Sequence, residues 1–354
     1  MADPQLNTSS KHLITTTMDN KRLKIVYVLT SSPNDIYLEQ AYVSMCSLKH
    51  YNPEAQVIIL TDQLTAATFT GTRKKETRFA DEIKVVDLPE NLNGQRRSRL
   101  LKTSARKHIE GDFLFIDTDT IIAKPIDDIL NVEADLAACY DTHCEDIKQD
   151  PYYYNIKRNA LKIGTPIEDE KHYFNSGVIL VRDTPIAHKF YELWHENLAL
   201  SVGKNVFQDQ PSFKKTDCEL GHVLKPLPDV WNVELKHGIR FLKDAKIIHY
   251  LCTNKSKNKE RQFFIMNDME VLLKIKENGE IIPEVMATIG DPFKGLSPLS
   301  HCFAGEDVYF FTTDLFKAAR NMYGSKHFKT WNYLASKYIR LNIRIEGLKK
   351  RLRK

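Results

Sequence analysis

The chain has 354 residues, of which 42% are hydrophobic, 10% aromatic and 27% charged, with 14 glycines and 14 prolines. This composition excludes collagen, low-complexity chains and disulfide-dense mini-proteins, and the length suits either about two domains or one α/β domain with appendages. The net charge of +5 is concentrated in residues 335–354, which hold eight cations and one anion. Because the rest of the chain is close to neutral, we expect a local basic tail and no nucleic-acid-binding domain.

The cysteines and the aliphatic runs bear on the compartment. Six cysteines are scattered without a CxxC pair, and no early segment combines a basic start with an apolar stretch. Reduced thiols inside a cell are therefore expected. The longest aliphatic runs, such as 57–60 and 178–181, are far shorter than the roughly 18 residues that span a bilayer. The sequence thus predicts a cytoplasmic protein that crosses no membrane.

The first elements follow a short polar leader. Residues 1–20 carry no hydrophobic period and are expected to be disordered or a remnant of expression. A β-branched run at 24–29 predicts a buried strand, which ends in a polar loop. Helical spacing over 37–50 and a second apolar run at 57–60 follow. Strand, helix and strand at this spacing predict a parallel sheet wound in the βαβ sense.

The same patterns continue along the chain. Further strands are expected at 84–87, 113–116, 136–139, 178–181 and 246–248, and helices at about 98–108 and 186–200. They predict a doubly wound α/β domain over 21–255, in which ligands bind beyond the carboxyl ends of the strands.

The C-terminal quarter is less regular. We expect an extension over 256–330, with a helix-like stretch at 267–276 and a loop rich in glycine and proline at 290–298. From Trp331, apolar residues recur at steps of three and four with lysine and arginine between them. This pattern predicts a basic amphipathic helix over 331–354.

Two carboxylates directly follow the strand at 113–116. In an extended chain Asp117 and Asp119 would point the same way, and such close carboxylates repel one another unless a cation or a proton lies between them. A hard divalent ion such as Mn²⁺ or Mg²⁺ suits these oxygen ligands and could bridge to a diphosphate. The position at the carboxyl edge of the sheet favours metal binding over a strand-end turn in which Asp119 caps the backbone and Asp117 is merely solvated.

Two other functions fit parts of the pattern. Asp-Thr-Asp-Thr after an apolar strand also matches the first motif of haloacid dehalogenase-like phosphatases, with Asp117 as nucleophile and Asp119 as general acid. That motif normally lies on the first strand and needs a later acidic pair, whereas here Asp127 and Asp128 follow too soon. A non-catalytic protein that binds a sugar or a sugar nucleotide is the third possibility.

The ordered series of segments over 24–255 resembles glycosyltransferase family 8. These are retaining nucleotide-sugar transferases that include glycogenin and bacterial lipopolysaccharide galactosyl- and glucosyltransferases. The resemblance implies a GT-A fold, which has a mixed, doubly wound sheet with a Rossmann-like nucleotide-binding half, followed here by a mainly helical C-terminal extension. It also implies a UDP-sugar donor and Mn²⁺ or Mg²⁺ as cofactor.

The loop after the first strand is similar to the family's nucleotide-binding loop. The resemblance implies that Tyr37 stacks on the uracil, with Asn34 or Asp35 on the edge of the base and Thr30 in the same loop. An ordinary helix-capping loop would have the same residue types.

Two cationic positions and one threonine complete the expected nucleotide site. Arg99 is similar to the arginine of the family's Arg-Leu pair, which reaches the nucleotide sugar, and Lys102 is the alternative. A solvated helix face is the competing interpretation of both. We also expect Thr118, between the two aspartates, to contact the nucleotide.

The sugar pocket is expected from two further motifs. Asn175, Ser176 and Gly177 resemble a family strand that lines the sugar pocket, where Asn175 binds a sugar hydroxyl and Gly177 permits close backbone approach. Asp209 and Gln210 look like the family's Asp-Gln pair, with Asp209 gripping sugar hydroxyls and Gln210 on the face opposite the leaving group. Both are therefore assigned as catalytic and sugar-binding.

The last motif supplies the third metal ligand. His249 ends a strand at the place of the family's ligating histidine, and Lys255 matches the lysine that binds the diphosphate. Cys252 replaces a family glycine, and Ser256-Lys257 replaces Pro-Trp, so this diphosphate clamp is altered.

The resemblance and the tail together predict the reaction and its place. We expect transfer of glucose or galactose, with retention, to a glycan or to a lipid-linked or lipopolysaccharide-like acceptor. The cationic helix over 331–354 favours an anionic membrane surface, since each charge near the lipid contributes about 1 kcal/mol. The protein would then lie at the inner face of a membrane. The same spacing also suits a seam against a partner chain, and hence an oligomer, or a solvated terminal helix.

Overall fold

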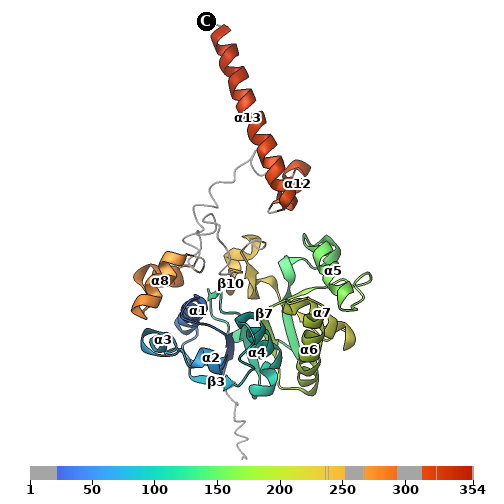
Figure 1. Cartoon of the computed structure of the whole chain (residues 1–354). Helices are drawn as coiled ribbons and strands as arrows, with labels where there is room; N and C mark the ends of the chain where they lie inside the picture. The colour runs from blue at the N-terminus through green and yellow to red at the C-terminus, as the bar shows by residue number, and fades with distance from the viewer. Residues whose placement is uncertain are drawn as a thin grey trace, which may run out of the picture.

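A seven-stranded mixed sheet forms the centre of the protein (Figure 1). The computed structural model describes residues 22–251 except 236 and 238, residue 266, residues 268–292, and residues 313–352 except 324. The strand order is β3-β2-β1-β4-β7-β6-β8. Their bounds are β1 Lys24–Leu29, β2 Gln56–Asp62, β3 Glu82–Val86, β4 Phe113–Ile116, β6 Leu136–Tyr140, β7 Phe174–Val181 and β8 Lys225–Pro226.

The directions of the strands divide this sheet into two parts. Strands β3, β2, β1 and β4 are parallel to one another, whereas β7 runs antiparallel to both β4 and β6, and β8 is parallel to β6. Side chains of β1 alternate between the two faces, with Ile25 and Tyr27 in one core and Val26 and Val28 in the other. The predicted doubly wound α/β sheet of mixed direction, as in the GT-A type, is confirmed.

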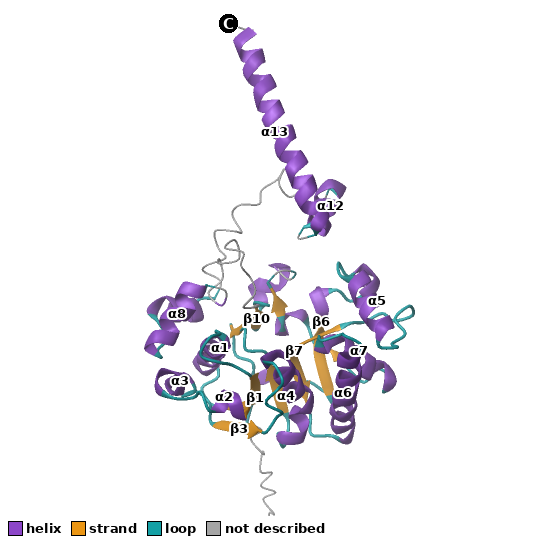
Figure 2. Ribbon diagram, in the orientation of Figure 1, coloured by secondary structure: helices purple, strands orange, loops and turns teal. Residues whose placement is uncertain are grey.

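Helices cover both faces of the sheet (Figure 2). Helix α1 packs on one face, and α4, α6 and α7 supply Leu101, Trp194 and Phe213 to the other. The helices are α1 Tyr37–Tyr51, α2 Gln63–Ala66, α3 Gly71–Glu76, α4 Gly94–His108, α5 Tyr153–Lys162, α6 Pro185–Gly203, α7 Asp209–Glu219, α8 Met269–Asn278, α9 Pro283–Gly290, α12 Asp314–Met322 and α13 Lys326–Leu352. Short 3₁₀ turns lie at Asp127–Asn131, Asp141–His143, Ile147–Gln149, Asp229–Trp231 and Ile239–Asp244.

A second, three-stranded sheet flanks the first. It consists of β5 Thr120–Ile122, β10 Ile247–His249 and β9 Val233–Glu234, with β10 antiparallel to β5 and parallel to β9. Its apolar side chains pack with residues of α1, α8 and α9. Of these three strands only β10 was predicted from the sequence, because strands of two or three residues are too short to show a hydrophobic period.

Most expected elements are present, with shifted ends. Strands β1 and β4 begin and end as predicted, and the expected helix at 267–276 is α8. Strand β7 begins at Phe174, earlier than the predicted residue 178, and the helix expected from Trp331 belongs to the longer α13. The 1–20 leader, the boundary at residue 255 and most of the loop at 290–298 lie outside the described residues. Across the described part of the chain, none of the helices has both the length and the apolar character of a membrane span.

Candidate active site

The chain bends directly after β4, where the two aspartates lie. Residues 117–119 are not extended, so the expected alternation along a strand is wrong as the reason for their convergence. The bend is held by a hydrogen bond from the Asp117 N–H to the Gly177 carbonyl (2.8 Å) and another from Thr120 Oγ1 to the Asp117 carbonyl (2.9 Å). The chain then returns as β5, which pairs with β10 and places His249 opposite Thr120.

Asp117, Asp119 and His249 meet at this bend. The Nε2 atom of His249 lies 3.2 Å from Oδ1 of Asp119 and 4.0 Å from Oδ2 of Asp117. One ligand atom from each residue falls within 4.8 Å of the other two. Two carboxylates and an imidazole at these distances suit a divalent ion such as Mn²⁺. The resemblance to family 8 grouped His249 with the two aspartates, although it is more than a hundred residues away from them in the sequence.

A chain of amide groups fixes the orientation of His249. Asp141 accepts a hydrogen bond from Nδ2 of Asn175 (2.8 Å), and Oδ1 of Asn175 accepts from Nδ2 of Asn232 (2.9 Å). The Oδ1 atom of Asn232 then faces Nδ1 of His249 at 2.9 Å and must act as acceptor. Because Nδ1 carries the proton, Nε2 has the lone pair that can bind a metal.

Burial and neighbouring charges shift the pKa values of Asp117 and His249. Burial raises the pKa of the Asp117 carboxyl, against the opposing effects of Lys102 and His249. For His249, burial opposes the charged form, but the neighbouring Asp119 outweighs it and raises the pKa of the imidazole. Without a metal ion the group therefore tends to hold a proton, which a divalent cation would displace. The donor set and its electrostatics fit a metal ion.

Asp209, the first residue of α7, is held in place by two cations of α4. Arg99 Nε lies 2.9 Å from its Oδ1 atom, while Lys102 Nζ lies 3.0 Å and Ser176 Oγ 2.8 Å from Oδ2. Burial opposes ionisation here, but the charges of Arg99 and Lys102 prevail and hold the pKa of Asp209 well below its usual range. Lys102 also lies 3.3 Å from Oδ1 of Asp117 and so links Asp209 to the group of Asp117, Asp119 and His249.

Asp141 and Asn232 were not identified as site residues from the sequence. Asp141 directly follows β6, at the same sheet edge as Asp117, and this position is the signal that could have found it. Burial raises the pKa of the Asp141 carboxyl, and the hydrogen bond from Asn175 opposes this effect. The next residue, Thr142, has a φ of 53°, an uncommon backbone conformation that is frequent at functional sites.

The loop after β1 is braced by Asp35. Its carboxylate accepts hydrogen bonds from Ser31 Oγ (2.7 Å), the Ser32 N–H (2.8 Å) and the Tyr37 N–H (3.2 Å). Thr30 is tied through its Oγ1 to the carbonyl of Gly94 at 3.0 Å. Asp35 therefore shapes the loop from within.

The remaining predicted residues lie around these groups. Asn34 is exposed at the loop, and Tyr37 is half-buried. Thr118 is half-buried in the bend between the two aspartates. Lys255 lies outside the described residues.

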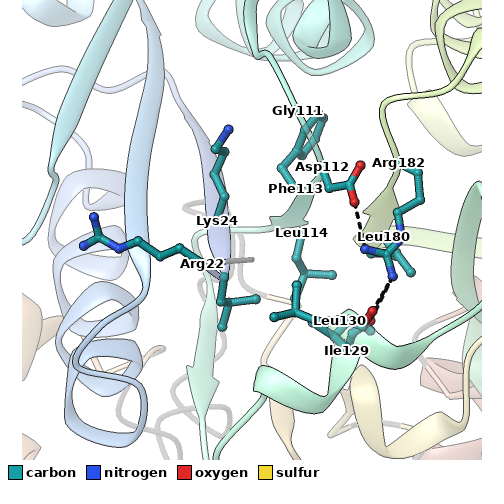
Figure 3. Close-up of a pocket in the computed structure, with 11 residues that line it drawn as sticks. Arg22, Lys24, Gly111, Asp112, Phe113, Leu114, Ile129, Leu130, Leu180 and Arg182 are labelled. Carbon is teal, nitrogen blue, oxygen red and sulfur yellow. Dashed lines mark hydrogen bonds and ion pairs between the residues drawn. The ribbon is translucent and has the colours of Figure 1, made fainter. Parts of the chain in front are cut away.

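A cavity of about 290 Å³ opens at the other edge of the sheet, near the amino ends of β1 and β4 (Figure 3). Its cations are already engaged, since Lys24 Nζ donates to the Glu110 carbonyl (2.6 Å) and Arg182 donates to Asp112 (3.0 Å) and to the Leu130 carbonyl (2.8 Å). Asp117, Asp209 and His249 are not among the residues that line this cavity. We therefore place the active site at the carboxyl edge.

A comparison with family models identifies the family of this chain. Residues 92–273, just over half of the chain, match the family model of nucleotide-diphospho-sugar transferases. This chain belongs to the nucleotide-diphospho-sugar transferase family. The matched span contains both aspartates of the bend, Asp209 and His249. The phosphatase alternative for Asp117 has no support from this membership.

Solved structures of glycosyltransferases resemble this transferase at low identity. Mouse xyloside xylosyltransferase 1 is 15% identical, with 65% of this chain and 98% of that chain covered and a TM-score of 0.45. The galactosyltransferase LgtC, in complex with donor and acceptor sugar analogues, is 15% identical, with 75% and 100% covered and a TM-score of 0.47. The glycosyltransferase GlyE from Streptococcus pneumoniae TIGR4 is 15% identical, with 77% and 64% covered and a TM-score of 0.44. A comparison with curated proteins found no match.

Proposed function

We propose that this glycosyltransferase is of the family 8 type and moves glucose or galactose from a UDP-sugar to a glycan or lipid-linked acceptor, with retention of the anomeric configuration. The observation that carries the proposal is the convergence of Asp117, Asp119 and His249 beside the Asp209–Lys102 pair. Metal ligands and sugar-holding groups then share one sheet edge, as the transfer of a glycosyl group from a diphosphate requires.

Asp117, Asp119 and His249 would hold Mn²⁺ or Mg²⁺. When bound, the ion supplies positive charge for the diphosphate that departs. The resemblance assigns Lys255 to the same diphosphate. Thr30, Asn34 and Tyr37 would contact the nucleotide from the loop that Asp35 braces, and Thr118 would contact it from the bend between the two aspartates.

The chain's own residues orient the sugar. The proposed contacts to its hydroxyls come from Asp209, Asn175 and Ser176, all nearly fully buried before any ligand binds. Arg99 and Lys102 hold the Asp209 carboxylate in one position. Such preorganisation lowers the barrier because reacting groups need not be ordered during the reaction.

The state of Asp209 supports attack on the front face. Both of its oxygens are engaged by cations, and its pKa is lowered, so it is a poor nucleophile. Gln210, the next residue, has a neutral amide that does not form a stable glycosyl intermediate. The acceptor hydroxyl would therefore approach from the side of the departing diphosphate, which retains the configuration.

The domain division and the acceptor belong to the same proposal. Residues 21–255 would be the catalytic domain, 256–330 an extension and 331–354 the segment that meets an anionic membrane surface at its cytoplasmic face. Large apolar side chains of α13 are exposed, among them Trp331, Tyr338 and Leu341. This exposure supports a lipid-linked or lipopolysaccharide-like acceptor.

One assay tests the function. The full chain is incubated with Mn²⁺ and a panel of sugar nucleotides, and hydrolysis and thermal shift are measured. We expect a response to UDP-glucose or UDP-galactose only with the metal, and a loss of at least about a hundredfold in turnover for Asp117→Asn. Asp127→Asn, an exposed aspartate outside the bend, is the control. Metal-independent turnover, or equal activity of the two variants, would refute the metal site. Binding without turnover on any acceptor would favour the non-catalytic alternative, and an inverted product would refute retention.

A further inference from the structure

A second group of metal-ligating side chains lies at the far end of α7. Glu170, in the connection between α5 and β7, meets Cys218 near the end of α7 and His222 in the turn that follows. One ligand atom from each lies within 4.8 Å of the other two. None of these residues takes part in the sugar-nucleotide site described above.

Glu170 binds Lys214 with one carboxylate oxygen, and its carboxylate also interacts with the thiol of Cys218. Its Oε2 atom accepts from Lys214 Nζ at 2.6 Å, whereas Oε1 faces Nε2 of His222 at 3.7 Å. A separation of this size suits two atoms that bind the same ion at about 2 Å each in a tetrahedral site. Lys214 is almost fully buried, so it holds the carboxylate in place.

The histidine is oriented by a second carboxylate. Asp217 is almost fully buried, and its Oδ1 accepts from the Leu224 N–H (2.9 Å), while Oδ2 lies 3.5 Å from Nδ1 of His222. A metal-bound histidine commonly directs its other ring nitrogen to a carboxylate, which fixes the tautomer. The pair therefore has the arrangement of a metal-bound histidine and its supporting group.

We propose that Glu170, Cys218 and His222 form a binding site for Zn²⁺, separate from the Mn²⁺ site. Sulfur, imidazole and carboxylate together are the ligands of zinc rather than of Mg²⁺ or Mn²⁺. When Cys218 loses its proton on metal binding, the two carboxylates and the thiolate balance the charges of Lys214 and the divalent ion. Because His222 is exposed, the fourth position is open to water.

The position of the site suggests what the ion does. Helix α7 carries Asp209 and Gln210 at its other end, and β7, which begins just after Glu170, carries Asn175 and Ser176. An ion that joins Glu170 to Cys218 ties these two elements together. Zn²⁺ would therefore stabilise the sugar-holding part of the protein without touching the sugar.

Cobalt titration of the full-length, metal-free chain tests the proposal, since Co²⁺ bound to a thiolate gives a charge-transfer band in the near ultraviolet. Among the residues that the structure describes, no sulfur lies with Asp117, Asp119 and His249, so this group should not give the band. We expect one band that Zn²⁺ abolishes, with release of about one proton per ion. Cys218→Ser should remove the band, and Glu170→Gln or His222→Ala should weaken Co²⁺ affinity at least about tenfold.

Matched controls and a second readout keep the test decisive. Cys144→Ser and His188→Ala change a half-buried cysteine and an exposed histidine elsewhere and should leave the band unchanged. In saturating Mn²⁺, Zn²⁺ should raise the Tm of the parent chain by about 5 °C but not that of His222→Ala. A band that persists in Cys218→Ser, its absence from the parent chain, or equal Zn²⁺ stabilisation of parent and variant would overturn the proposal. Transferase activity enters none of these measurements, so the proposed function can fail independently.

Discussion

At Gly177 there is no space for a side chain, because His249 lies directly against it. A β-carbon there would lie 2.4 Å from Cε1 of His249 and 2.9 Å from Oδ1 of Asn175. His249 cannot turn aside without losing Asn232. We expect Gly177→Ala to weaken Mn²⁺ binding at least about tenfold, measured by calorimetry, and to reduce transfer about a hundredfold. Gly203→Ala in α6, with no neighbouring atom within 4 Å, should keep both. Unchanged Mn²⁺ affinity in Gly177→Ala would contradict the proposed ligand set.

Lys102 is the buried cation on which Asp117 and Asp209 both depend. Replacing it by methionine keeps an apolar stem but removes the ammonium group, which lies 4.7 Å from the centre of the Phe115 ring, and leaves the buried Asp209 with Arg99 alone. Because the buried Asp209 carboxylate then loses one of its two cationic partners, Lys102→Met should lower the free energy of unfolding by about 1–3 kcal/mol in urea. Lys107→Met, at an exposed position of the same helix, should change it by less than about 0.5 kcal/mol. Equal effects of Lys102→Met and Lys107→Met would show that the ion pairs of Lys102 with Asp117 and Asp209 contribute nothing to stability.

At the scale of elements, α1, α3 and α8 meet around two buried glutamates. Glu39 and Glu76 have no exposed surface, and Arg73 and Lys276 lie 3.7 and 3.4 Å from Glu39. Burial, and secondarily the charge of Glu39, raise the pKa of Glu76 to about 8, although Arg73 and Lys276 oppose the shift. The folded chain thus holds a proton that the unfolded chain releases above about pH 4.3.

This proton makes stability depend on pH. The favourable contribution of protonated Glu76 is complete below the pKa of the unfolded chain and is lost as the pH rises towards about 8. The slope within this window is at most about 1.4 kcal/mol per pH unit. Glu76→Gln should flatten urea-derived stability between pH 5 and 8 and be more stable than the parent at pH 8. The exposed Glu54→Gln should keep the parent's slope, and parallel curves for all three chains would exclude Glu76 as the titrating group.

Element boundaries also explain where the sequence misled. The hydrophobic pattern predicted that the strand begins at residue 178, yet Asn175 and Ser176 are already buried within β7. Their polar groups are satisfied by Asp141, Asn232, Lys102 and Asp209, which come from four other segments. Local hydropathy cannot report such partners.

For the whole molecule, the prediction concerns α13. Its exposed apolar residues and the cations of the last twenty residues favour an anionic membrane surface. Removal of residues 335–354 should shift the protein from anionic vesicles to the soluble fraction in flotation. Neutral vesicles are one control. The other is Leu161→Ser in α5, since Leu161 is as exposed as Leu341 of α13. Unchanged flotation of the truncated chain would indicate that this helix instead packs on a partner or is merely solvated.

The sequence by itself determined the α/β class, the core strands and the position of the two aspartates after a strand, because hydrophobic period and strand-end position are local properties. The other residues of the carboxyl edge were expected from the resemblance to family 8. The sequence did not determine how the aspartates converge. A bend held by Gly177 and a second small sheet bring His249 to them, and in that sheet β5 and β10 pair although they are more than a hundred residues apart. Asp141, the amide chain to His249 and the group at Glu170 likewise arise from contacts between distant elements, which only the folded chain decides.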